Sequence, residues 1–266
     1  MKNIIFVLSI LLCFSLLIFG KIQYDSKLKG IAQEAQSTFE VSEQPEMVQK
    51  QEQVNSNVAS IQAREIHPQL QDKLINAINN KENFRLAIAG SNAIATSEDT
   101  QIPWPKLVIE ELNDTYGEST FDVMVYELGN STTQQVLENG LHNEIAEFQP
   151  DVLLFEPLIL NDNNNFVMDV TLSNITTILT DIRDTSPDVF VVLQPPNPIY
   201  RPNYFLQQAR ELKLYAEEND YVYIDHWEAW PSITDAEIQN FIEGTRPNQK
   251  GHDIWASVIS EFFLGE

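Results

Sequence analysis

The chain has 266 residues, and 43% of them are hydrophobic and 10% aromatic, which is enough for a substantial core. Its formal net charge of −23 repels phosphate backbones and anionic headgroups, so nucleic acid is not expected as a partner. The single cysteine, Cys13, excludes an internal disulfide and a cysteine-based zinc site. Because the carboxylates form no metal-ligand pattern, we expect neither a metal nor a cofactor.

The N-terminus carries an almost unbroken apolar stretch from Ile4 to Phe19, after Lys2. It is slightly shorter than the ~20 residues that span a bilayer, which is typical of a signal peptide. The residues that follow lack a small-residue cleavage pattern, which favours a retained anchor. We therefore expect residues 1–20 to be a signal peptide or a membrane anchor that places the rest of the chain outside the cytoplasm. Positively charged residues usually lie on the cytoplasmic side of a membrane segment, and the three lysines after the stretch argue against this orientation.

Residues 21–69 are rich in Gln, Glu, Ser, Asn and Lys and poor in apolar side chains. Such a segment buries too little surface to fold alone. We interpret it as a polar stalk or linker, although unstructured or partly helical filler fits the composition equally well. The globular domain is then expected over residues 70–266.

From residue 70 onward, short β-branched runs alternate with stretches of helical periodicity, which is typical of βα units around a parallel sheet. The pattern predicts strands over 84–89, 121–126, 151–155, 188–193 and 221–224. It predicts helices over 104–116, 132–148, 169–185 and 204–218, and a last helix that begins near Pro247. We therefore expect an α/β fold, a three-layer flavodoxin-like sandwich with a parallel sheet of about five strands.

In such a sheet the functional groups lie on the loops at the carboxyl ends of the strands. Polar residues and glycines follow the predicted strands at these points: Gly90, Ser91 and Asn92; Gly129, Asn130 and Ser131; Glu156, Pro157, Asn161 and Asp162; Gln194 to Asn197; and, before the last helix, Glu243 to Asn248.

Several of these segments resemble the blocks of the SGNH/GDSL hydrolase family. Pro247, Asn248, Gly251, His252 and Trp255 have the order and spacing of the family's last block, Asp-Gly-x-His-Pro-Asn-x-x-Gly-His. Gly90, Ser91 and Asn92 are similar to Gly-Asp-Ser, and Asn161 with Asp162 is similar to Gly-x-Asn-Asp without its glycine. The resemblance implies an ester hydrolase fold, with Gly129 and Asn161 as oxyanion donors.

The positions that the resemblance assigns to catalysis carry other residues. The nucleophile position holds Asn92, the acid position Glu243 and the base position Arg246. A carboxamide has no nucleophilic oxygen, and a guanidinium stays protonated and accepts no proton. Glu243 and Arg246 are instead spaced to form an ion pair with each other.

Two alternatives remain for the polar residues around this site. Ser91 could act as the nucleophile with His252 or His226 as the base, or all three could make only local polar contacts. Gly129 and Asn161 could still hold a carbonyl or an anion, or Asn161 could simply start a turn. The Pro-rich loop from Gln194 to Pro202 could form a wall that stacks on a sugar ring, or only pack rigidly.

These observations lead to two functional hypotheses. The first is a tethered, weakly active or non-catalytic homologue that binds an acylated cell-envelope polymer or a partner protein through the former catalytic cleft. The second is an active esterase, which removes O-acyl groups from a surface glycan, a lipid or another small ester with Ser91 or an altered triad.

Overall fold

We analysed a computed structural model of the chain. It describes Lys21, Lys27, Val58, Ala59, Ile61, Gln62 and residues 64–96 and 100–265. The chain divides into two compact units, Met1–Ser56 and Asn57–Glu266. The apolar stretch at 4–19 and most of the predicted stalk lie outside the described residues. Within the described ranges, no helix is both long enough and apolar enough to cross a membrane.

The second unit is built on a parallel sheet with the strand order β2-β1-β3-β4-β5. Its strands are β1 (Phe84–Gly90), β2 (Phe121–Glu127), β3 (Val152–Phe155), β4 (Phe190–Leu193) and β5 (Val222–Tyr223). This is the flavodoxin-like order, and the chain reverses direction across the sheet between β1 and β3. The prediction of a parallel five-stranded α/β fold is therefore confirmed.

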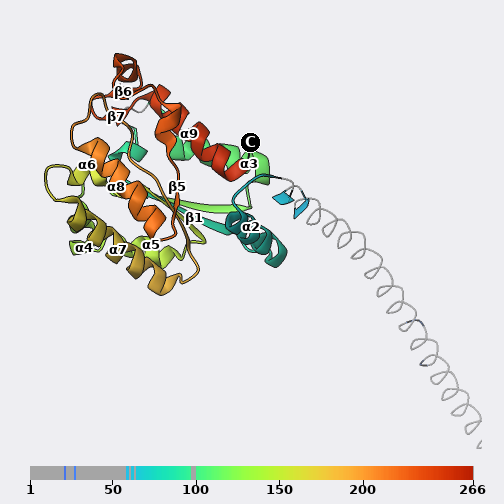
Figure 1. Cartoon of the computed structure of the whole chain (residues 1–266). Helices are drawn as coiled ribbons and strands as arrows, with labels where there is room; N and C mark the ends of the chain where they lie inside the picture. The colour runs from blue at the N-terminus through green and yellow to red at the C-terminus, as the bar shows by residue number, and fades with distance from the viewer. Residues whose placement is uncertain are drawn as a thin grey trace, which may run out of the picture. The chain divides into compact units, whose positions relative to one another are not determined.

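Helices cover both faces of the sheet (Figure 1). One face is covered by α2 (Pro68–Asn80), α3 (Trp104–Tyr116) and α9 (Gln249–Leu264), and α3 packs along α9. The other face is covered by α4 (Thr133–Glu138), α5 (Asn143–Phe148), α6 (Ile159–Asp162), α7 (Met168–Thr185) and α8 (Phe205–Glu218).

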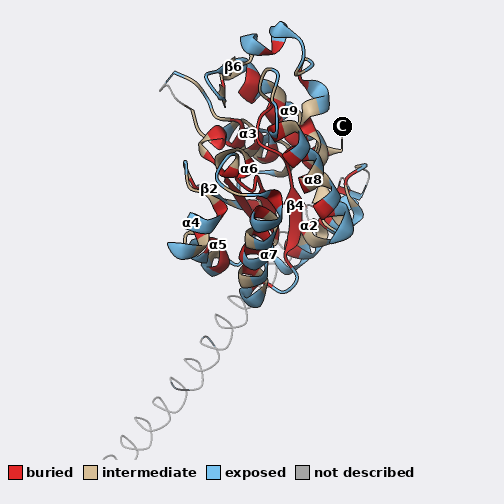
Figure 2. Ribbon diagram, turned by 60° about the vertical axis from the view of Figure 1, so that its left-hand side comes forward, coloured by how far each residue is buried: buried red, intermediate tan, exposed pale blue. Residues whose placement is uncertain are grey.

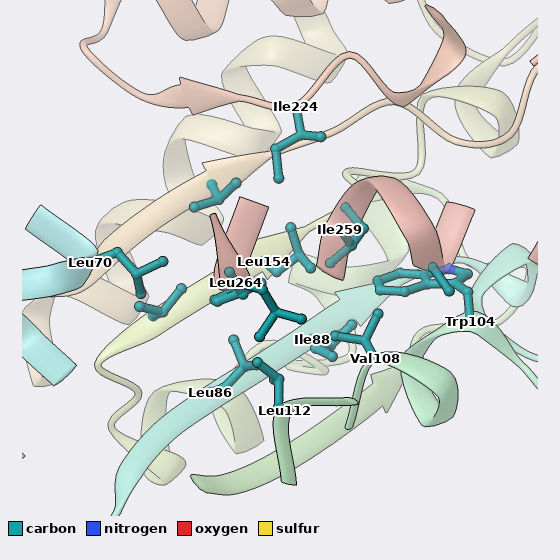
Figure 3. Packing of buried hydrophobic residues seen from close by; sticks show 14 of the residues in the cluster. Leu70, Leu86, Ile88, Trp104, Val108, Leu112, Leu154, Ile224, Ile259 and Leu264 are labelled. Atoms are coloured by element: carbon teal, nitrogen blue, oxygen red, sulfur yellow. The ribbon is translucent and has the colours of Figure 1, made fainter. Parts of the chain in front are cut away.

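Alternate strand residues supply the two cores, because side chains in a strand point to opposite faces in turn. Leu86, Ile88 and Leu154 pack under α3 and α9, as Figure 3 shows, whereas Ala87 and Leu153 pack under α7 and α8. All four residues of β4 are buried, so this strand is sandwiched between the helix layers (Figure 2). Such continuous apolar strands are expected when both faces of a parallel sheet are covered.

Two predicted elements differ from the structure. The helix expected over 132–148 is two helices, α4 and α5, because the chain takes a left-handed conformation at Gly140. Glycine is the residue that most easily adopts this conformation after a helix end. The segment from Glu243 to Asn248, expected as a loop, contains a hairpin of β6 (Ile242–Glu243) and β7 (Arg246–Pro247).

The core extends beyond the predicted start of the domain at residue 70. Ile61 is 1% exposed and Ile66 is also buried, and both belong to the cluster under α2, α3 and α9. The guanidinium of Arg64 donates a hydrogen bond of 2.8 Å to the carbonyl of Leu264. The segment just before α2 is therefore packed against the end of α9.

We predict that Ile61→Ala in the full-length chain lowers the free energy of unfolding by about 2–5 kcal/mol, because it removes a buried side chain and leaves a cavity. Denaturant unfolding measures this change. Gln62→Ala, at the exposed neighbouring position, is the control. Equal effects of the two substitutions would mean that residue 61 does not belong to the domain core.

Candidate active site

The structure brings the former nucleophile and base positions together at the carboxyl edge of the sheet. Asn92 begins the short 3-10 helix η1 (Asn92–Ile94), which follows β1 directly. Arg246 begins β7, and β7 contacts η1. The Nδ2 of Asn92 also donates a close hydrogen bond to the Oδ1 of Asn130, on the loop after β2. The loops after β1 and β2 and the hairpin thus meet at one place.

The proposed oxyanion donors make hydrogen bonds within the site. The Nδ2 of Asn161 donates to the carbonyls of Gly129, at 3.0 Å, and of Ser131, at 2.9 Å. The backbone N–H of Asn92 also donates to the carbonyl of Gly129, at 3.0 Å. Because an amide nitrogen carries two hydrogens, both donors of Asn161 are in use. These contacts involve the carbonyl of Gly129 and not its backbone N–H, which is the donor that the resemblance implies.

Asp162 connects α6 to the start of α4 and to α7. This buried carboxylate accepts hydrogen bonds from the backbone N–H of Thr133, at 2.9 Å, and from the hydroxyls of Thr133 and Thr171, at 2.6 and 2.7 Å. The three donors come from the start of α4 and from α7. Asp162 thereby fixes α6, which carries Asn161, against the loop after β2.

Glu243 and Arg246 are backbone partners across the β6–β7 hairpin. The turn between them contains Gly244 in a left-handed conformation. Among the described residues, Lys213 forms an ion pair with Asp225 and the ring of His142 lies 2.9 Å from Asp181, whereas the expected ion pair between Glu243 and Arg246 is not formed.

The Pro-Asn-x-x-Gly-His segment has a structural explanation at each position. The side chain of Asn248 caps α9 by accepting from the N–H groups of Lys250 and Gly251. A Cβ on Gly251 would lie 2.3 Å from the carbonyl of Phe241, so only glycine fits there. His252 is buried and accepts a 3.3 Å hydrogen bond from the N–H of Trp104 at Nδ1.

His226 is also buried and fully used by its neighbours. Its Nδ1 accepts from the indole N–H of Trp230 at 3.1 Å, which leaves Nε2 to donate to the carbonyl of Pro195 at 2.9 Å. Its ring stacks on Trp255. Burial lowers the pKa of His226 to about 3 and that of His252 to about 4, so both rings are neutral near pH 7.

Ser91 is only 3% exposed and lies between the turn of η1 and a buried carboxyl group. Its hydroxyl accepts from the N–H of Ala93 at 3.2 Å, the local turn contact that the sequence allowed. Its own N–H donates to Oε2 of Glu156 at 2.7 Å. The other carboxylate oxygen of Glu156 accepts from the N–H of Leu158 at 3.0 Å.

Glu156 is therefore a bridge between the loops after β1 and β3, a role that its place among the polar residues after the third predicted strand did not reveal. It is fully buried, and this burial raises its pKa to about 7 despite the hydrogen bonds from Ser91 and Leu158, which favour the charged form. The available signal was a charged residue directly after the apolar strand Val152–Phe155. Among the described residues, no group of His, Cys, Asp and Glu side chains is arranged to hold a metal.

The same fold occurs in solved structures of esterases and lipases. A protein described as a GDSL-like lipase from Parabacteroides merdae aligns with 69% of this chain and 97% of its own, at a TM-score of 0.59 and 13% identity. A carbohydrate esterase family 3 protein from Talaromyces cellulolyticus aligns with 66% and 94%, at a TM-score of 0.54 and 17% identity.

A lipase/acylhydrolase from Enterococcus faecalis aligns with 66% of this chain and 93% of its own, at a TM-score of 0.53 and 19% identity. The chain has an SGNH/GDSL hydrolase-like fold. No protein-family model matches the sequence, and neither does any curated protein. The SGNH-like fold is therefore supported by structure at low sequence identity.

The buried groups of this site make the stability of the protein depend on pH in both directions. The pKa of Glu156 is raised, so its stabilising contribution is complete below the ordinary pKa and is lost as the pH rises through about 7. The pKa values of His226 and His252 are lowered, so their contribution is complete above the ordinary pKa and is lost as the pH falls toward about 4 and 3.

We predict that the melting temperature rises with pH up to about 7, because the two histidine rings outweigh the single carboxyl group over that range. Glu156→Gln should make this rise steeper between about pH 5 and 7, because it removes the opposing contribution of the carboxyl group, which corresponds to about 3 kcal/mol. Glu237→Gln, at an exposed position, is the control for the loss of one surface charge. An unchanged profile in Glu156→Gln would show that this carboxyl group does not titrate in that range.

Proposed function

We propose that this chain is a membrane-tethered, extracytoplasmic binding domain with an SGNH hydrolase-like fold and little or no esterase activity. The hydrogen bonding of Gly129 carries this proposal. Its carbonyl accepts from Asn161 Nδ2 and from the N–H of Asn92, so these donors are not free to stabilise an oxyanion.

The side chains at the triad positions support the same conclusion. Asn92 provides no nucleophilic oxygen, and Arg246, which lies close to η1, does not accept a proton at physiological pH. The carboxyl group of Glu243 is exposed on the hairpin. These three residues retain polar groups that suit binding, without the acid, base and nucleophile that turnover requires.

One observation favours the alternative of an active esterase, namely the contact between Ser91 and Glu156. A carboxyl group with a pKa of about 7 is suited to exchange protons near neutral pH. However, both groups are buried, and the hydroxyl of Ser91 already accepts from Ala93. The alternative histidine bases are occupied as well, because His226 and His252 each accept a hydrogen bond at Nδ1. A substrate would have to open the turn to reach Ser91.

The proposed ligand is an acylated polymer of the cell envelope. The fold is shared with proteins described as lipases and as a carbohydrate esterase, whose names indicate acyl groups and carbohydrate. The export segment at residues 4–19 would place the domain where such polymers occur. An acylated glycan offers the hydroxyl and carbonyl groups that Asn92, Asn130 and Arg246 can bind.

We predict that the full-length protein in detergent hydrolyses p-nitrophenyl acetate at a small fraction of the rate of an ordinary esterase, and that a serine-directed phosphonate does not label it. Loss of a triad leaves about 10³- to 10⁴-fold acceleration over water. Because the donors near Gly129 are occupied, we expect a rate at or below that range.

The combined change Asn92→Ser, Glu243→Asp and Arg246→His restores the three side chains of the family. It should raise the rate measurably, whereas Asn92→Ser alone should do little, because the three groups act as a unit. Strong wild-type turnover that Ser91→Ala abolishes would contradict the proposal and assign the protein to the active esterases.

We also predict that protease added to intact cells digests the acidic domain, because the apolar stretch at 4–19 directs it outward. Immunoblotting of the C-terminal domain before and after lysis measures its accessibility, and a cytoplasmic protein serves as the control. Protection of the domain until lysis would place it inside the cell, in agreement with the lysines that follow the stretch.

A further inference from the structure

A concave site lies away from Asn92 and Arg246, between α8 and the chain that follows β5. It is a pocket of about 320 Å³, at the lower end of the range for small-molecule sites. α8 packs beside β5 (Figure 1), and both elements contribute to the wall. The residues that decide its chemistry are Arg210, Lys213, Tyr223, Asp225, Trp227 and Glu228.

The aromatic wall of this pocket is held in a fixed position. The indole N–H of Trp227 donates to the carbonyl of Pro196 at 2.7 Å, and its ring packs against Phe205 with centroids 5.4 Å apart. Trp227 is nevertheless partly exposed, whereas the other three tryptophans, Trp104, Trp230 and Trp255, are buried. A fixed, partly exposed indole provides a binding surface that loses little conformational entropy when a ligand binds.

The polar part of the pocket is a fixed pair of opposite charges. Lys213 Nζ lies 3.1 Å from Asp225 Oδ2, and the two side chains are 44% and 32% exposed. Asp225 raises the pKa of Lys213, so the ammonium group stays charged. Arg210 and Glu228 add one further charge of each sign. The formal charge of this lining is therefore zero, although the whole chain carries −23.

These properties select among the classes of ligand. A hydrocarbon chain would remove water from the ion pair without replacing its hydrogen bonds, which is unfavourable. An anion would meet two carboxylates as well as two cations, so this lining gives it no net electrostatic attraction. A neutral sugar ring offers an apolar C–H face to Trp227 and hydroxyl groups that both donate and accept hydrogen bonds along its edge, where Lys213 and Asp225 lie.

One loop connects this pocket with the former catalytic cleft. The carbonyl of Pro196 anchors Trp227, and the next residue, the buried Asn197, donates from Nδ2 to the carbonyl of Thr245 at 3.1 Å. Thr245 directly precedes Arg246. The loop after β4 thus contacts both Trp227, which lines the pocket, and the β6–β7 hairpin.

We infer that this pocket is a subsite for one neutral pyranose ring of a polysaccharide, and that it recognises the unacylated sugar. The inference extends the proposed function, because the same polymer would contact both the cleft and the pocket. The two can be tested separately, because an unacylated oligosaccharide offers the cleft no acyl group to bind.

The test titrates the full-length protein in detergent with cellohexaose, xylohexaose and mannohexaose, and follows tryptophan fluorescence and its quenching by acrylamide. We expect at least one of these sugars to bind and to protect Trp227, the most accessible indole, from the quencher. Trp227→Ala should abolish the protection. It should weaken binding, measured by calorimetry, about tenfold or more, or about 1.4 kcal/mol.

Lys213→Met keeps the length of the side chain and removes the ammonium group, so it tests the pocket without loss of an aromatic ring. It should also weaken binding, whereas Lys250→Met on the exposed surface of α9 should not. A cleft variant, Asn161→Ala, should leave the affinity for unacylated sugars unchanged. Melting temperatures exclude unfolding as the cause.

Three outcomes would overturn the inference. The first is that none of the three sugars binds to the wild-type protein. The second is that both pocket variants bind them as well as the wild type does. The third is that octyl chains protect Trp227 from the quencher and sugars do not. If an acylated oligosaccharide still bound in a manner sensitive to Asn161→Ala, the proposed function of the cleft would survive the failure of the pocket. If the sugars bound in the pocket but acylation did not change their affinity, the inference about the pocket would stand and the proposed function of the cleft would be contradicted.

Discussion

The carboxyl group of Glu156 lies where the loops after β1 and β3 separate, and it accepts one hydrogen bond from each loop. The strand order changes direction at this point, which opens a crevice in every sheet of this type. A buried carboxyl group across the crevice must have both oxygens satisfied, so it fixes the backbone at Ser91 and Leu158 together. Leu158 takes a left-handed conformation, and the chain continues from it into α6 and Asn161. The geometry of the site thus depends on one buried acid that takes no part in the family's chemistry.

A second buried acid, Asp162, orients the amide of Asn161. Asp162 draws α6 toward Thr133 and Thr171, and the amide of Asn161 is thereby directed at the carbonyls of Gly129 and Ser131. In an ester hydrolase such donors are held unsatisfied, at a cost in stability, until charge develops on the substrate. Here the amide of Asn161 and the N–H of Asn92 donate to carbonyls within the protein. This arrangement is consistent with asparagine and arginine at the positions where a nucleophile and a base would be needed.

Much of the fold could be predicted from the sequence because its signals are local. The helix predicted over 104–116 coincides with α3, since a single apolar stripe with Val108 and Leu112 and a proline at its start define it. The break at Gly140 and the role of Glu156 could not be predicted as easily. The partners of Glu156 come from loops that only the strand order brings together. The direction of the Gly129 carbonyl depends on the backbone conformation of the loop, which no side-chain pattern encodes. The motif around Gly251 was recognised by spacing, but its residues cap and pack α9.

The distribution of charge separates the two sites on this acidic chain. The cleft retains Arg246 near η1, whereas the pocket beside α8 balances two cations against two carboxylates. In a molecule with a net charge of −23, a balanced pocket neither attracts nor repels a neutral ligand over long distance, so binding there depends on contact and shape. Such contacts are individually weak, and two sites joined by the loop after β4 would gain affinity by holding one chain at two points. A polymer with repeated units suits this arrangement better than a small molecule, because a single small ester would occupy only one of the two sites.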